Sequence, residues 1–176
     1  MLSTLESAKG CKHSDGRRYI QRQFTRRIAG LQDLDYWERL TKLKLLSLQR
    51  RRERYMIIHV WKILNHLAPN DIKMEFTHSK RLGIKVKIPS FSKTAPQSAT
   101  RLYDESFAVH AGKLWNILPK EVTVTKQLDA VKILLGKFLR LYPDRPPTKG
   151  YTAQNRNSLI DWKLQSGGLQ LAQRPC

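Results

Sequence analysis

Residues 47–67 read SLQRRRERYMIIHVWKILNHL and carry the longest helical pattern in the chain. Apolar side chains recur there at the spacing of one helix face, at Met56, Ile57, Val60, Trp61, Leu64 and Leu67. Ser47 precedes this run and is the expected N-cap, while Ala68-Pro69-Asn70-Asp71 follows it as a stop. The segment therefore predicts one long helix over 48–67 with a single buried face.

The first two turns of that helix are crowded with Arg50, Arg51, Arg52 and Arg54. The N-terminus of a helix is already positive, so four cations there oppose the helix dipole. An anion that docks at this end would relieve the opposition. A solvated face that pairs with Glu53 and other acids is the alternative.

A second arginine-rich helix is predicted over 17–29, on the N-terminal side. Its apolar residues Ile20, Phe24 and Ile28 fall on one face at i, i+4 and i+8. Arginines fall on the opposite face at the same spacing, at Arg18, Arg22 and Arg26. Gly30 provides the stop, and Asp35 with Glu38 forms a capping-box pattern that starts the next helix.

Further helices are predicted over 104–117 and 127–142, and a short strand over 84–88 with Ile84, Val86 and Ile88 inward. The expected fold is mainly α, a bundle of about five helices with a short hairpin or irregular loop around 80–100. We expect a disordered lead-in over 1–16, one helical domain over 17–142 and, over 143–176, a flexible tail or a partial docking segment. The expected core includes Phe24, Trp61, Leu64, Phe107, Trp115 and Phe138.

The charge of the chain is strongly positive. There are 33 Lys and Arg against 14 Asp and Glu among 176 residues, a net charge of +19. Residues 1–67 hold 15 basic and 6 acidic side chains, so nearly half of the excess lies there. A polyanionic partner is favoured, with nucleic acid first and an anionic membrane surface second. Only Cys11 and Cys176 are present and no signal peptide is evident, so the chain is expected to be intracellular, nuclear or cytoplasmic, and not secreted.

Catalytic motifs are missing from the sequence. There is no GxxxxGK, GxGxxG, GxSxG or HExxH motif. Asp33 and Asp35 are the nearest approach to a carboxylate pair, and Asp35 is better explained as a helix cap. Cys11 with His13 lacks further ligands at zinc-finger spacing, and His59 with His66 is explained by packing. The sequence predicts no catalysis by this chain alone, no cofactor, no metal site, no membrane partner and no small-molecule substrate.

The candidate binding residues are arginines, whose guanidinium groups match phosphate oxygens in forked geometry. They are Arg18, Arg22, Arg26, Arg27, Arg50, Arg51, Arg52 and Arg54. Contact with backbone phosphates is expected, without base-specific readout. Tyr19 and Tyr36 are candidates for base stacking or, equally, for core or rim positions.

Four segments in order resemble one family. They are YIQRQFTRRIAGL at 19–31, LDYWERLTKLKLLSLQRRRERYMIIHVWKILN at 34–65, SFAVHAGKLWNILPKEV at 106–122 and LDAVKILLGKFL at 128–139. They are similar to the region that follows the polymerase palm in reverse transcriptases of LINE-type, jockey-like non-LTR retrotransposons. Residues 110–113, 130–132 and Gly136 depart from the family pattern, as in a truncated or drifting copy.

The resemblance implies that the parent protein is an RNA-directed DNA polymerase. Residues 17–142 would be its thumb-like part, a non-catalytic fragment that binds template–primer through phosphates, while the palm and its catalytic aspartates are missing. Trp115 is expected as a core anchor and Asn116 as a helix C-terminal residue. The alternatives are a helical protein-interaction module, whose Trp61, Trp115 and Phe138 surfaces pack on the missing palm, and a degenerate remnant without independent activity.

Overall fold

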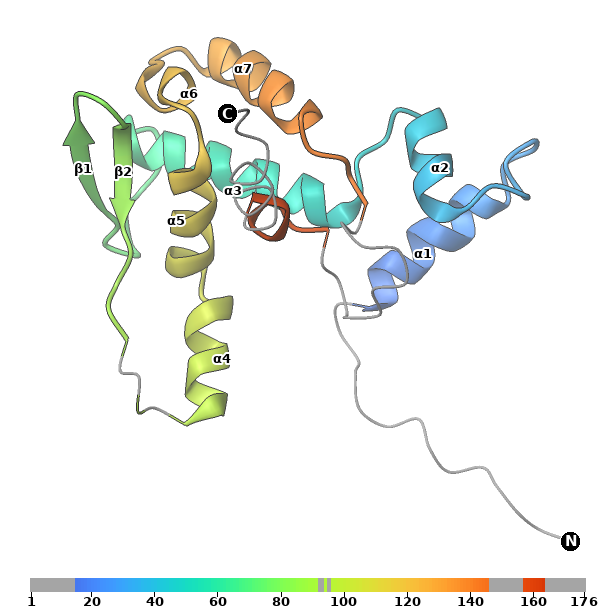
Figure 1. Ribbon diagram of the computed structural model, residues 1–176, viewed down its shortest axis with the longest axis horizontal. Helices are drawn as coiled ribbons and strands as arrows, with labels where there is room; N and C mark the ends of the chain where they lie inside the picture. Colours follow the sequence, from blue (N-terminus) through green and yellow to red (C-terminus); the bar gives the residue numbers. More distant parts are fainter. Residues whose placement is uncertain (1–14, 92–93, 95, 146–156, 164–176) are drawn as a thin grey trace, which may run out of the picture. The chain divides into compact units, whose positions relative to one another are not determined.

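The computed structural model describes residues 15–91, 94, 96–145 and 157–163 (Figure 1). For residues 15–19 and 101 it describes the backbone but not the side chains. The chain divides into two compact units, Met1–Leu48 and Gln49–Cys176. The described residues form seven labelled helices and one antiparallel hairpin. The predicted fold class, mainly α with a short hairpin, is confirmed. The predicted single domain over 17–142 differs from the observed boundary, which falls at the start of the longest helix.

The first unit contains α1 (Asp15–Arg26) and α2 (Tyr36–Lys42). The predicted capping box is present, because the Asp35 carboxylate accepts from the Glu38 N–H at 2.8 Å and the Glu38 carboxylate accepts from the Asp35 N–H at 3.0 Å. Gly30 has φ of +74° in the connection between the two helices, a conformation that glycine adopts without strain. Leu31 and Leu40 are the buried apolar side chains of this unit.

The core of the second unit forms around α3 (Leu48–Leu64), which begins where the sequence predicts and ends three residues earlier. Trp61 and Trp115 are fully buried there, as expected, and Leu64, Phe107 and Phe138 pack against the same cluster as half-buried side chains. The Trp61 indole N–H donates to the Thr125 carbonyl at 2.7 Å, so its polar atom is satisfied inside the core.

The hairpin joins β1 (Glu75–Ser79) to β2 (Gly83–Lys87), with Phe76 opposite Val86. Val86 is buried and Ile84 half-buried, in agreement with the predicted inward face of the strand. Lys85 points partly inward instead of outward, since its ammonium donates to the carbonyls of Asn116 and Leu118. A lysine at the carboxyl end of a helix is favoured by the helix dipole.

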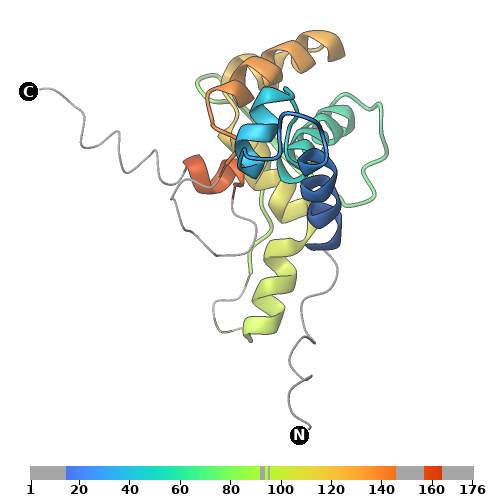
Figure 2. The same ribbon diagram turned by 90° about the vertical axis from the view of Figure 1, so that its right-hand side faces the viewer.

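The labelled helices that follow the hairpin are α4 (Gln97–Glu105), α5 (Phe107–Ile117), α6 (Lys120–Val124) and α7 (Leu128–Arg140). The helix predicted over 104–117 is two helices, because Ser106 adopts an extended conformation with ψ of 143°. In both views α4 extends away from the rest of this unit, beyond the end of α5 (Figure 2). Helix α7 agrees closely with its predicted range.

The C-terminal part of the chain is not a free tail throughout. Residues 159–163 form a short helix, and Leu159 is fully buried in the core cluster of the second unit. Of the predicted lead-in, residues 15 and 16 already belong to α1, and the remainder lies outside the described residues. A flexible tail is therefore wrong for 157–163, whereas the alternative of a partial docking segment agrees with their contacts to α3.

Candidate nucleic-acid interface

The arginines near the end of α1 are exposed to solvent, whereas the side chains at its start lie outside the described residues. Arg22 and Arg26 are exposed on α1, and Arg27 is exposed just after it, as predicted. Arg18 lies in α1, but its side chain is outside the described residues. Helix α1 carries no acidic residue after Asp15, so the exposed guanidinium groups have no acid on their own helix within the last two turns.

Tyr36 is already engaged within this unit. The Arg22 guanidinium carbon lies 4.9 Å from the centre of the Tyr36 ring, a cation–π distance. The edge of Trp37 contacts the same ring, with centroids 4.8 Å apart, and the Tyr36 hydroxyl donates to Gln21 at 2.6 Å. These contacts favour the structural interpretation of Tyr36 over base stacking. The Tyr19 side chain lies outside the described residues.

Phe24 is not a core residue. Its side chain is 66% exposed, and so is that of Ile20 one turn earlier. The buried side of α1 is centred on Thr25, whose hydroxyl accepts from the buried Arg39 guanidinium Nε at 3.2 Å. A second Arg39 nitrogen donates to the Leu34 carbonyl. Polar contacts to α2 therefore set the orientation of α1. Of the predicted apolar stripe, Ile20 and Phe24 face solvent and Ile28 is half-buried.

Arg50, predicted to contact phosphate, is buried in the second unit. It is 1% exposed, and its guanidinium donates to the carbonyls of Pro143 at 3.2 Å and Asn157 at 3.3 Å. Its Nε lies 3.8 Å from an Asp144 carboxylate oxygen and 4.0 Å from a Glu53 oxygen. The two carbonyls and Asp144 lie far along the chain, so the local pattern of α3 gave no sign of them. Arg50 holds the C-terminal segment and does not face a partner.

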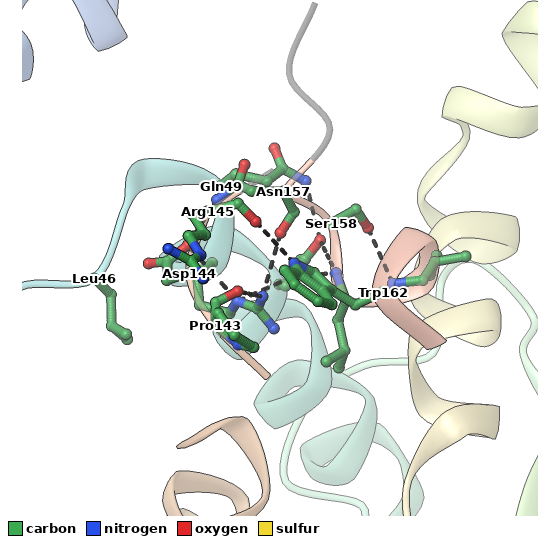
Figure 3. Close-up of polar contacts among 12 residues, drawn as sticks. Leu46, Gln49, Pro143, Asp144, Arg145, Asn157, Ser158 and Trp162 are labelled. Atoms are coloured by element: carbon green, nitrogen blue, oxygen red, sulfur yellow. Dashed lines mark hydrogen bonds and ion pairs between the residues drawn. The ribbon is translucent and has the colours of Figure 1, made fainter. Parts of the chain in front are cut away.

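Glu53 is the acidic half of the same buried network. Its carboxylate accepts from the Leu159 N–H at 3.2 Å and from the Gln49 amide at 3.2 Å. Pro143, Asp144, Asn157 and Ser158 gather around these groups near the start of α3 (Figure 3). Burial raises the pKa of Glu53, and the hydrogen bonds from Ser158, Gln49 and Leu159, together with the charge of Arg50, oppose that rise.

The other three arginines in the first turns of α3 are accessible to solvent to different degrees. Arg51 is exposed, while Arg52 and Arg54 are half-buried. Helix α3 has one acidic residue, Glu53, and that residue is turned into the core. The outer side of α3 consequently carries positive charge without an acid from its own helix. This arrangement suits an anionic partner.

The LWNxLP segment at 114–119 hydrogen-bonds to strand β2 of the hairpin. The Trp115 indole N–H donates to the Ile84 carbonyl at 2.9 Å. The Asn116 amide donates to the Val86 carbonyl and its oxygen accepts from the Val86 N–H, both at 2.8 Å, as a neighbouring strand would. Both side chains are therefore structural, in agreement with the sequence-based assignment of Trp115 to the core and Asn116 to a helix end.

Gly83 makes this close packing possible. Its φ is +74°, and a Cβ at this position would lie 2.4 Å from the Thr123 hydroxyl. Lys80 and Arg81 are both exposed in the turn that precedes Gly83, and the Lys120 ammonium donates to the Lys80 carbonyl at 2.7 Å. Sequence reasoning did not select this turn as basic surface. The pair Lys80-Arg81 beside Gly83 was the available signal.

The described residues contain neither a cluster of metal-ligating side chains nor a helix suited to span a membrane. Among them, no group of three or more His, Cys, Asp or Glu side chains is placed to hold a metal ion. His59 makes an edge-on contact with Phe107 at 5.5 Å between ring centres, and His66 lies beyond the end of α3 with φ of 58°. Cys11 and His13 are outside the described residues. No described helix is long and apolar enough to cross a membrane.

Comparison of the chain with models of known protein families, with curated proteins and with solved structures finds no match.

Proposed function

We propose that this chain is a non-catalytic nucleic-acid-binding fragment of a non-LTR retrotransposon reverse transcriptase, and that it grips the template–primer backbone through arginine–phosphate contacts. The resemblance of residues 19–139 to the region after the palm supports the parentage. One structural observation carries the binding. Helix α3 turns its only acid inward and leaves Arg51 exposed, with Arg52 and Arg54 half-buried.

The two units supply separate basic surfaces. The first consists of Arg22, Arg26 and Arg27 at the end of α1, and the second of Arg51 and its neighbours on α3. Guanidinium groups on a helix surface contact phosphate oxygens without reading sequence. The proposed activity is therefore backbone binding, with affinity that depends on salt and little on sequence.

Fluorescence anisotropy of a labelled RNA–DNA duplex tests the proposal. Binding by the full chain is expected to weaken as salt rises, with a log–log slope of about −0.9 for each phosphate neutralised. Primer extension with Mg²⁺ or Mn²⁺ is expected to give no product. Absent or salt-independent binding contradicts the proposal, and polymerase activity of the pure chain contradicts its non-catalytic part.

A protein-interaction module is the second candidate, and one observation favours it. Ile20 and Phe24 form an exposed apolar stripe on α1. The surfaces first expected to serve this role are not available, because Trp61 and Trp115 are buried and Phe138 packs against the core. This function predicts association that persists at high salt and is lost in Phe24→Ser, measured by sedimentation.

A further inference from the structure

We infer that Tyr55 on α3 stacks against an unpaired base of a nucleic-acid strand whose phosphates lie along the cations beside it. The inference rests on the proposed function, since it takes nucleic acid as the partner. It specifies which form of nucleic acid binds: a single strand, or an unpaired stretch at a duplex end. Tyr55 is 65% exposed in the middle of a long helix.

The neighbours of Tyr55 share its face of α3. Arg51 lies one turn before it and His59 one turn after, at the i, i+4 spacing that places side chains in one row. Arg52 at i−3 and Lys62 at i+7 border the same row. Arg51 and His59 are exposed, and Arg52 and Lys62 are half-buried. The row from Arg51 to Lys62 extends roughly 16 Å along the helix.

The opposite face of α3 explains why this row lies toward solvent, although the His59 ring also makes its edge-on contact with Phe107. Ile57, Val60 and Trp61 fill the core, and Arg50 with Glu53 is occupied by the C-terminal segment. The sole acid of the helix is thus removed from the outer row. What remains outside is a tyrosine ring bordered by cations, and this combination complements a chain of phosphates with bases between them.

Two other aromatic side chains among the described residues are less suited to stacking. Tyr36 is held by Arg22 and Trp37, and Phe91 lies against Tyr103 with ring centres 4.6 Å apart. Tyr55 presents its ring to solvent on the helix that carries the basic row. Every base has a π-face, so stacking on this ring adds affinity without sequence preference.

The test uses the full chain and two probes: a single-stranded oligonucleotide of roughly 12 nucleotides with one 2-aminopurine, and its duplex. Wild-type protein is expected to quench the 2-aminopurine of the single strand. Tyr55→Phe keeps the ring and is expected to bind and quench like wild type. Tyr55→Leu keeps apolar surface without the ring, and is expected to lose the quenching and to weaken single-strand binding roughly 10-fold. Its duplex affinity is expected to stay within about twofold, because phosphate contacts remain.

Leu102→Ala is the matched control, since Leu102 is 71% exposed on α4 of the same unit and lies off the basic row. Circular dichroism of each variant is expected to match wild type, because Tyr55 contributes little buried surface. The inference is overturned if Tyr55→Leu quenches and binds like Tyr55→Phe, which would indicate a purely apolar contact such as a protein partner makes. It is also overturned if Tyr55→Leu weakens both probes equally. If wild type binds neither probe, the proposed function fails and the inference fails with it.

Discussion

Helices α1 and α3 look alike in sequence, yet they sort their side chains in opposite ways. Both combine closely spaced arginines with apolar residues at helical spacing. Helix α3 buries its apolar face together with Arg50 and Glu53. Helix α1 buries Thr25 and leaves Ile20 and Phe24 in solvent.

The difference shows that the helix period alone does not decide which side chains are removed from water, because the groups that pack against the helix decide it as well. Arg50 is buried because carbonyls of Pro143 and Asn157 and two carboxylates meet it there. Arg22 and Arg26 meet no such group in the described part of their unit apart from the Tyr36 ring. A buried guanidinium must be paired and hydrogen-bonded, whereas an exposed one is retained at little cost.

The largest expected effect comes from breaking the buried network. Arg50→Ala leaves Glu53 and Asp144 without their cation, and the expected loss in free energy of unfolding is about 3–5 kcal/mol. Arg51→Ala is the matched control and is expected to stay within about 0.5 kcal/mol of wild type. Urea unfolding measures both values. Equal stability of the two variants would mean that Arg50 is not the residue that secures the C-terminal segment.

A second pair of variants addresses the first unit. Leu40→Ala removes a buried side chain and is expected to cost about 2–5 kcal/mol, whereas Phe24→Ala is expected to cost less than about 0.5 kcal/mol. Thermal unfolding followed by circular dichroism compares them. A large loss of stability for Phe24→Ala would contradict its exposed position and would favour the orientation of α1 that the sequence pattern predicts.

A smaller effect is expected from the titration of Glu53. Because burial raises the pKa of Glu53 above the ordinary value of 4.5, its contribution to stability is complete below pH 4.5 and decreases as pH rises through the folded-state pKa. Glu53→Gln removes this titration. The stability of wild type relative to Glu53→Gln is therefore expected to fall as pH rises above 4.5, and a difference that stays constant or grows with pH would contradict the assignment.

Much of the fold could be predicted from local signals. The Asp35–Glu38 capping box, the start of α3 and the range of α7 follow from spacing and caps that act within a few residues. The break at Ser106, the short helix α6 and the docking of 157–163 could not be predicted, because each depends on tertiary contacts. Within the candidate site, the exposure of Arg22 and Arg51 follows from the helix period. Arg50 and Glu53 stand seven residues before Ile57 and Val60, so the helix period places them on the buried face of α3. The groups that make this burial tolerable for Arg50 lie about a hundred residues away, and no local pattern records them.

The central claim is that the outward arginines of α1 and α3 bind phosphates, and the salt dependence of duplex binding by paired variants tests it most directly. Arg22→Gln with Arg26→Gln removes two exposed cations from the first unit, and Arg51→Gln with Arg52→Gln removes one exposed and one half-buried cation from the second. Each pair is expected to reduce the magnitude of the log–log slope by about 0.9 for every phosphate that is no longer neutralised. Lys113→Gln with Lys132→Gln is the matched control, since these lysines already pair with Asp104 and Asp129, and it is expected to leave the slope unchanged. Slopes that change as little in the arginine variants as in this control would contradict the account.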